Sequence, residues 1–201
     1  MKKIILASAS PRRIEMMKDN GFDPEIIPAH VDEKLPFAMT PEASAMYLAL
    51  KKASCAAELY ENTDTDENDD ILVIGADTIV VDDDKIIGKP KNADEAFDIL
   101  SRLRSRHHHV ITGVCIITVD KESCRKICFY DKTRVFFRDY SDEELTSYIC
   151  TSEPYDKAGG YAIQGTFGKY VDHIEGNLDN VIGFPLKLIK RPIGQKELVT
   201  P

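Results

Sequence analysis

Two serines and two adjacent arginines stand close together near the start of the chain, in the stretch SASPRR at residues 8–13. The apolar run at residues 3–7 predicts a buried strand, and Ser10 followed by a proline is typical of a helix start. Unpaired backbone N–H groups and the positive end of the helix dipole favour a phosphate there. Arg12 and Arg13 oppose that dipole, and a bound anion would resolve the conflict. The same residues could instead form an ordinary capped helix whose arginines pair with surface acids.

A second candidate is the carboxylate of Asp77 in GADT, residues 75–78. An apolar run precedes it, so we expect Asp77 at the carboxyl end of a strand, where α/β sheets place their ligand clefts. It could act as a catalytic base or a metal ligand, or it could make an Asx turn. Lys89 lies in GKP, residues 88–90, where a lysine could reach a phosphate or remain solvated on a hairpin.

The segment EPYDKAGGYAIQG, residues 153–165, combines charged side chains with three glycines and ends in Gln164 and glycine. Glycine permits close backbone approach to a ligand, and a glutamine amide can read one donor and one acceptor on a base edge. The segment could also be a structural turn. Three histidines at 107–109 are a poor metal site, because neighbours on a strand face opposite sides. The acidic run at 61–70 predicts a solvated loop.

Composition limits the classes of function. The 201 residues carry a formal net charge of −8 at pH 7, which argues against binding to nucleic-acid polymers. An anionic ligand therefore needs a local basic site. No apolar run approaches the roughly 20 residues of a membrane span. The five cysteines lack zinc-ligand spacing, so we expect reduced and mostly buried thiols in a cytoplasmic protein.

The elements that must position these residues alternate between strand and helix patterns. After the first strand and helix, a second helix is predicted from Pro41, with an apolar face at Ala43, Met46, Leu50, Ala53 and Ala57. Two apolar runs around residues 82–84 predict a hairpin. Capping patterns at Asn92/Glu95 and Ser141/Glu144 begin two further helices. Residues 109–119, 126–137 and 169–174 favour strands, and residues 185–190 a last short helix.

We therefore predict one α/β domain over residues 1–201, with a mixed central β-sheet flanked by helices, which could form two lobes around a central cleft.

Together the motifs resemble the Maf family of nucleoside triphosphate pyrophosphatases, which was first associated with septum formation. The shared segments occur in family order along nearly the whole chain; they are SASPRR, VDE (31–33), LALKKA (48–53), GADTIV (75–80), GKP, TGV (112–114), EPYDKAGGYAIQG and NVIGFP (180–185). The resemblance implies a Maf/Ham1-like fold. SPRR and DKAG…IQG are similar to the branch acting on dTTP and UTP. The 7-methyl-GTP branch tends to carry tryptophan before the second arginine, where this chain has Arg12.

The resemblance also implies roles for single residues. Asp77 matches the proton acceptor, and base specificity falls to Arg12, Thr78 and Gln164. Phosphate binding is assigned to Ser8, Ser10, Arg13, Lys52 and Lys89. A divalent metal, Mg²⁺ or Mn²⁺, is assigned to Glu33 and Asp77. Helical periodicity does not decide between Lys51 and Lys52; only the LALKKA register favours the second.

The chemistry implied by the resemblance is hydrolysis of a nucleoside triphosphate between its α and β phosphates. Pyrophosphate and a nucleoside monophosphate are the products, with water as nucleophile. The implied partner is a small nucleotide, with no nucleic-acid polymer and no membrane, and the implied assembly is a homodimer. Two alternatives remain open at this point: a pyrophosphatase for purine or modified nucleotides, and a nucleotide-binding regulator of cell division with little catalysis.

Overall fold

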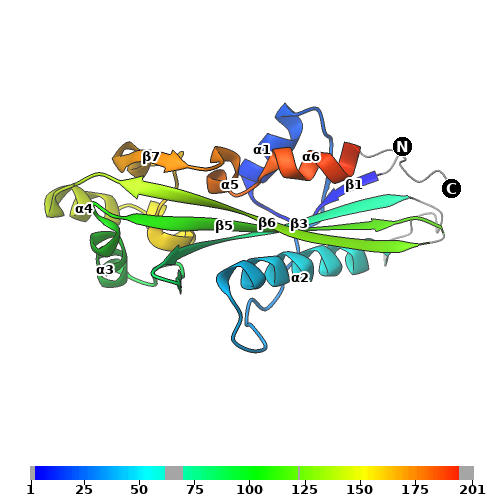
Figure 1. Cartoon of the computed structure of the whole chain (residues 1–201), viewed down its shortest axis with the longest axis horizontal. Coiled ribbons are helices and arrows are strands. Elements are labelled where there is room, and N and C mark those ends of the chain that lie inside the picture. The colour runs from blue at the N-terminus through cyan, green and yellow to red at the C-terminus, as the bar shows by residue number, and fades with distance from the viewer. Residues whose placement is uncertain (1–2, 62–69, 122, 195–201) are drawn as a thin grey trace.

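The computed structural model describes residues 3–61, 70–121 and 123–194. Within these ranges the chain folds around a seven-stranded mixed sheet in the order β2-β1-β3-β5-β6-β7, with β4 paired to β3. The predicted mixed sheet flanked by helices is confirmed. Figure 1 shows the long strands β3, β5 and β6 running through the length of the molecule. These strands continue through both halves of the molecule.

The first half of the sheet is parallel. Strand β1 (Lys3–Leu6) pairs with β2 (Glu25–Ile26) on one side and with residues 71–74 of β3 (Ile71–Asp82) on the other. Helix α1 (Pro11–Asp19) follows β1. All other pairings are antiparallel, between β3, β5 (His107–Val119), β6 (Cys124–Phe137) and β7 (Val171–Glu175).

The hairpin between β3 and β4 (Lys85–Ile87) forms where the apolar runs predicted it. Asp82 pairs with Lys85, and the two residues between them, Asp83 and Asp84, have φ angles of 46° and 62°. A two-residue loop with positive φ at both positions matches the right-handed twist of the flanking strands, and aspartate tolerates this conformation better than most residues.

The later helices agree with their sequence patterns. Helix α3 (Ala93–Leu103) buries the predicted apolar face, and the Asn92 side chain accepts from the Glu95 N–H at 2.9 Å. Helix α4 (Asp142–Ile149) has a complete capping box between Ser141 and Glu144. Three 3₁₀ turns, η1 (Glu153–Asp156), η2 (Ala158–Gly160) and η3 (Thr166–Tyr170), connect it to β7. Helices α5 (Leu178–Ile182) and α6 (Leu186–Gly194) complete the described chain.

Helix α2 (Pro41–Glu61) crosses one face of the sheet (Figure 1) and packs closely against two glycines of its strands. A Cβ atom on Gly75 of β3 would stand 2.3 Å from the Ala49 carbonyl oxygen, and one on Gly113 of β5 would stand 2.3 Å from the Ala45 carbonyl carbon. Only glycine on the strands and small residues on the helix permit this approach. The glycines therefore set the distance between α2 and the centre of the sheet.

The predicted apolar face of α2 is partly wrong. Ala53 and Ala57 are buried as expected, but Ala43, Met46 and Leu50 are only half-buried. The buried face is Ser44, Ala45, Leu48, Ala49, Ala53, Ala56, Ala57 and Tyr60. The helix is rotated toward its small residues because close contact with the sheet glycines outweighs the burial of larger side chains.

The apolar core is divided between the two halves of the sheet. In one half, Met17 of α1 and Ile189 of α6 pack on one sheet face, and α2 covers the other. In the other half, α3, α4 and the 3₁₀ turns enclose an aromatic-rich cluster around Phe167. The prediction of mostly buried cysteines is wrong: Cys115 is buried and Cys55 is half-buried, whereas Cys124, Cys128 and Cys150 are exposed. All five thiols are free.

Most of the acidic run at 61–70 lies outside the described residues, so its prediction as a solvated loop stays a prediction. Among the described residues, no helix has the length and apolar character needed to cross a membrane.

Candidate active site

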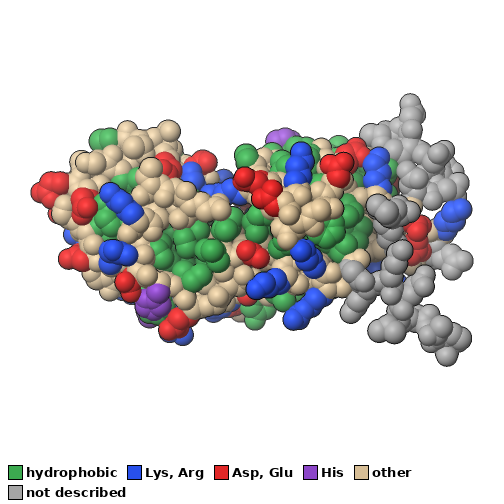
Figure 2. All heavy atoms as spheres, turned by 90° about the horizontal axis from the view of Figure 1, so that it is seen from above, with side chains coloured by type: hydrophobic (Ala, Val, Ile, Leu, Met, Phe, Trp, Pro, Cys, Tyr) green, Lys and Arg blue, Asp and Glu red, His purple; other side chains and the backbone are tan. Residues whose placement is uncertain are grey.

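The site forms where one edge of β3 lies open. Strand β1 pairs with β3 only as far as Ile74, and β4 joins the same edge from Val80 onward. Residues 75–79 therefore have no partner strand on this side among the described residues. A cavity of about 510 Å³ lies against this gap, between the two halves of the molecule. Figure 2 shows the notch from above, with Lys and Arg side chains gathered at it.

The cavity is basic although the protein is acidic. Five basic and three acidic side chains line it: Arg12, Arg13, Lys52, Lys89 and Lys157 against Glu33, Asp77 and Asp156. Its apolar lining includes Val80, Ile87, Val110 and Tyr161, which belong to the core cluster around α3 and α4. One cavity thus joins a charged region to an apolar one.

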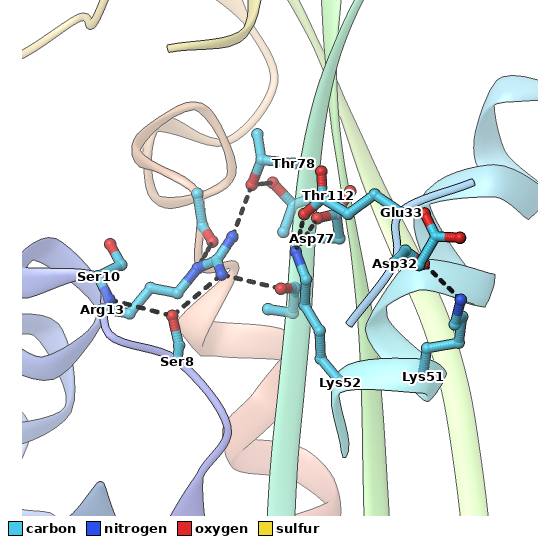
Figure 3. A network of polar contacts seen from close by, with 12 residues as sticks. Ser8, Ser10, Arg13, Asp32, Glu33, Lys51, Lys52, Asp77, Thr78 and Thr112 are labelled. Atoms are coloured by element: carbon cyan, nitrogen blue, oxygen red, sulfur yellow. Dashed lines mark hydrogen bonds and ion pairs between the residues drawn. The ribbon is translucent and has the colours of Figure 1, made fainter. Parts of the chain in front are cut away.

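Asp77 lies at the centre of the charged region. Its Oδ1 atom is 2.5 Å from the Nζ atom of Lys52, and Lys52 Nζ is also 2.8 Å from Glu33 Oε1. Figure 3 shows Lys52 rising from α2 toward Asp77 and Glu33, while Lys51 turns away to the backbone oxygen of Asp32. The hydrogen bond from Lys52 holds the pKa of Glu33 below its usual value. The geometry therefore separates the two neighbouring lysines, which periodicity alone left open.

The expected position of Asp77 at the end of its strand is wrong. Strand β3 continues to Asp82, and Asp77 stands near its middle, paired in register with Gly113. The rule that clefts lie beyond carboxyl ends still applies, but to β1, which stops at Leu6. The ending of β1 exposes the edge of β3 on which Asp77 sits.

Arg13 joins three segments around the cavity (Figure 3). Its Nε donates to the Gly183 carbonyl oxygen at 2.9 Å, Nη1 to the Ala76 carbonyl oxygen at 2.8 Å and to Ser8 Oγ at 3.3 Å, and Nη2 to Thr78 Oγ1 at 3.1 Å. Burial lowers the pKa of the guanidinium from its usual value, although Asp77 opposes this effect. Four of the five guanidinium N–H groups are thus used within the protein. The conflict between arginine and the helix dipole is resolved at Arg13 by the protein's own oxygens.

Arg12 and Lys89 are the more available cations. Both line the cavity, and neither makes a hydrogen bond or ion pair with another residue in the described part of the chain. Ser10 also lines the cavity and occupies the N-cap position of α1, but its side chain makes no capping hydrogen bond. Ser8 lies just outside the lining, where its Oγ accepts from the Ser10 N–H at 3.2 Å and so shapes the turn before the helix.

The three residues assigned to base specificity are not all brought together. Arg12 and Thr78 line the cavity, whereas Gln164 is exposed and does not line it; its neighbour Ile163 does. Gly183 lines the cavity next to Thr78 and has a φ of +111°. A Cβ atom there would stand 3.1 Å from Thr78 Oγ1, so both the backbone conformation and the space favour glycine.

Two buried polar residues behind Thr78 were not singled out from the sequence. Thr112 and Asn180 are fully buried, and Thr112 Oγ1 lies 3.0 Å from Thr78 Oγ1. Their signal was present in the TGV and NVIGFP segments, where a polar residue stands beside apolar ones.

The histidine run contributes a structural contact. His108 is buried, and its Nε2 lies 2.6 Å from the hydroxyl of the cavity residue Tyr161. Burial, together with the neighbouring His109 and His107, lowers the pKa of His108 to about 3. The His107 side chain is exposed, as expected for alternating residues of a strand.

Comparison with known proteins agrees with the motif pattern. The family model described as Maf-like protein matches residues 3–195. A protein of Caldicellulosiruptor bescii named dTTP/UTP pyrophosphatase is 47% identical over 186 residues, which cover 92% of this chain and 90% of that protein. One of the same name from Geobacillus sp. (strain WCH70) is 42% identical over 193 residues, covering 96% and 97%. A third, from Desulfitobacterium hafniense, is 42% identical over 190 residues, covering 94% and 83%. The chain belongs to the Maf-like protein family.

Proposed function

We propose that the protein is a nucleoside triphosphate pyrophosphatase that acts on dTTP and UTP. The observation that carries this proposal is the placement of Asp77, Lys52 and Glu33 in one cavity with Arg12 and Lys89. The relatives that share most of this chain's length are named for the same activity. A triphosphate carries about four negative charges, and an acidic protein needs such a local basic site to bind it.

The two kinds of lining suit the two parts of a nucleotide. The apolar surface of Val80, Ile87 and Tyr161 can receive a base, and the basic side chains can receive the phosphates. Arg12 and Lys89 have N–H groups open to phosphate oxygens. Arg13 and Ser8 support the same region from behind, since most of the Arg13 donors already hold the protein together.

The acidic side chains fit a divalent metal that arrives with the nucleotide. Carboxylate oxygens of Glu33 and Asp77 are hard ligands of the kind that Mg²⁺ or Mn²⁺ prefers, and both approach the same ammonium group. Among the described residues, no group of three His, Cys, Asp or Glu side chains could hold a metal. Mg²⁺ commonly binds through one or two carboxylates, phosphate oxygens and water, so two protein carboxylates suffice. When bound, such a cation neutralises phosphate charge and acidifies a coordinated water.

The protein's own residues then direct hydrolysis. Asp77 orients a water molecule and accepts its proton, and Lys52 fixes the position of that carboxylate. The water oxygen bonds to phosphorus, the α–β phosphoanhydride bond breaks, and pyrophosphate leaves with the bonding electron pair. Arg12 and Lys89 stabilise the charge that moves onto the departing oxygens. Positioning and charge stabilisation carry most of such a reaction.

Base specificity is assigned to Arg12, Thr78 and Gln164. Gln164 is exposed and follows the cavity residue Ile163 in the chain, so its part in base specificity stays a prediction.

A substrate panel tests the proposal. Pyrophosphate release is measured with dTTP, UTP, CTP, GTP and 7-methyl-GTP, each with Mg²⁺, with Mn²⁺ and with a chelator. We expect release with dTTP and UTP in the presence of either metal, and little with the purine nucleotides. A preference for 7-methyl-GTP would place the protein in the branch of the family that acts on that nucleotide. Tight nucleotide binding without pyrophosphate release would favour a regulator in place of an enzyme.

The proposed assembly and location rest on the resemblance to the Maf family. We propose a cytoplasmic homodimer built from a single domain per chain. Light scattering coupled to gel filtration measures the mass in solution, and a monomer mass at micromolar concentration would exclude the dimer.

A further inference from the structure

A chain of buried hydroxyl and amide groups runs from the cavity into the interior through Thr78. Thr78 on β3 and Thr112 on β5 are register partners, and their Oγ1 atoms are 3.0 Å apart. Thr78 lines the cavity, whereas Thr112 is fully buried. Figure 3 shows the two hydroxyl groups facing each other, with Arg13 reaching Thr78 from the opposite side.

Proton counting fixes the direction of this hydrogen bond. Thr112 Oγ1 lies 2.9 Å from the backbone oxygen of Asn180, and a carbonyl oxygen has no proton to give. Two oxygens at that distance repel unless a proton lies between them, so the Thr112 hydroxyl proton points to Asn180. A hydroxyl has only one proton. The 3.0 Å contact with Thr78 therefore uses the proton of Thr78.

The Asn180 side chain is held in one orientation by its own hydrogen bonds, which keeps the backbone oxygen of Asn180 beside Thr112 Oγ1. Its Oδ1 accepts from the Thr112 N–H at 3.0 Å, and its Nδ2 donates to the Val110 carbonyl oxygen at 3.0 Å and to Thr133 Oγ1 at 2.9 Å. Exchanging the amide oxygen and nitrogen would place a donor against an N–H and an acceptor against a carbonyl. Full burial makes such unpaired contacts costly.

The remaining capacity of the Thr78 hydroxyl is then defined. Its proton is directed to Thr112, and one lone pair accepts from Arg13 Nη2 at 3.1 Å, a group that can only donate. One lone pair remains, and Thr78 lines the cavity. Thr78 therefore offers the cavity an acceptor and no donor.

We propose that Thr112, held by Asn180, is a positioning residue that keeps Thr78 as a hydrogen-bond acceptor and so selects a base with a donor at N3. This inference rests on the proposed function. Uracil and thymine carry N3–H, whereas N3 of cytosine is itself an acceptor. Cytosine would place two lone pairs against each other, and a site that leaves polar groups unpaired rejects the wrong base.

Three variants test the role of Thr112 through the ratio of kcat/KM for UTP to kcat/KM for CTP. Thr112→Val keeps the shape but removes the acceptor for Thr78, whose proton can then turn toward the cavity. We expect the ratio to fall by about 10-fold, the effect of one hydrogen bond. Thr112→Ser retains the hydroxyl and should keep the ratio within about 2-fold of the parent protein. Thr118→Val is the matched control on the same strand, at a position paired with Leu72 and away from the cavity; it should leave the ratio unchanged.

A second measurement uses the parent protein and does not depend on the folding of a variant. N3-methyl-UTP lacks the donor, and 5-methyl-UTP carries the same methyl group but retains N3–H. We expect kcat/KM for N3-methyl-UTP to fall by about 100-fold or more relative to UTP, with at most a small change for 5-methyl-UTP. Equal use of both analogues would overturn the inference, as would an unchanged UTP/CTP ratio in folded Thr112→Val. Absence of any triphosphate hydrolysis in the parent protein would instead overturn the proposed function.

Discussion

The ammonium group of Lys52 lies between two carboxylates, 2.5 Å from Asp77 Oδ1 and 2.8 Å from Glu33 Oε1. The three residues come from helix α2, strand β3 and the segment before α2. Asp77 is almost fully buried in this arrangement, whereas Glu33 is more than half exposed. A buried carboxylate needs a paired charge, and Lys52 supplies it before any nucleotide binds.

Replacement of Asp77 tests the catalytic base. Asp77→Asn keeps the size of the side chain but cannot accept a proton from water. We expect the rate of pyrophosphate release to fall by about 10²–10⁴-fold, the usual contribution of a general base. Circular dichroism and the thermal midpoint should show that the fold persists. Asp84→Asn, in the exposed hairpin turn where asparagine also tolerates positive φ, is the control. A near-normal rate in Asp77→Asn would remove Asp77 from this role.

Replacement of Gln164 tests whether the exposed loop residue reads the base. Gln164→Ala should lower kcat/KM for dTTP and UTP, because an amide that pairs with the base edge is lost. The dependence of the rate on Mg²⁺ concentration should stay the same, since Gln164 does not line the cavity that contains Glu33 and Asp77. An unchanged ranking of the five nucleotides would show that Gln164 has no part in specificity.

The close contact between α2 and the sheet predicts that one methyl group added at Gly113 lowers the stability of the protein strongly. In Gly113→Ala the new Cβ would stand 2.3 Å from the backbone of Ala45, so the helix must move. We expect the free energy of unfolding to fall by roughly 1–3 kcal/mol or more, as in other overpacked cores. Activity should also fall, because α2 carries Lys52. The control for stability is Gly88→Ala, where no atom beyond the two neighbouring residues lies within 4 Å of the added Cβ. Urea denaturation measures both variants, and equal stability would contradict the close packing.

The buried His108 predicts how stability depends on pH. Its pKa is lowered from the usual value of 6.5 to about 3 in the folded protein. Between these values the unfolded chain binds a proton that the folded protein does not, so the free energy of unfolding must fall as the pH falls from about 6.5 toward 3. One such group contributes a slope of up to about 1.4 kcal/mol per pH unit. Above pH 6.5 its contribution is constant.

The variant His108→Gln should show a smaller loss of stability between pH 7 and pH 5 than the parent protein. Glutamine can still pair with the Tyr161 hydroxyl, but it does not titrate. Thr118→Val changes no titratable group and is the control; it should leave the pH dependence unchanged. Identical pH dependence in the parent protein and in His108→Gln would show that protonation of the buried imidazole does not lower the free energy of unfolding.

Local patterns in the sequence were sufficient for elements whose signals lie within a few residues. The capping box at Ser141 and Glu144, the apolar face of α3 and the hairpin at Asp83–Asp84 all depend on neighbours in the chain. The face of α2 was predicted less well, because it depends on Gly75 and Gly113, which are distant in sequence and lie on two other elements.

The sequence was likewise sufficient to predict some features of the candidate site and insufficient for others. The motifs indicated which residue types are present, including a carboxylate at Asp77 and cations at Arg12 and Lys89. They could not show that Arg13 donates four hydrogen bonds to oxygens of the protein itself. One of these acceptors, Gly183, is far from Arg13 along the chain. Nor could they show that Gln164 stands outside the cavity.

The sequence by itself therefore determined the order of the elements, the family and the chemical groups available, since these follow from local propensity and motif content. Only the tertiary structure decided which of two adjacent lysines meets Asp77 and which oxygen receives the proton of Thr78. The physical reason is that an ion pair or hydrogen bond depends on distance in space, and these partners lie 25 and 34 residues apart along the chain.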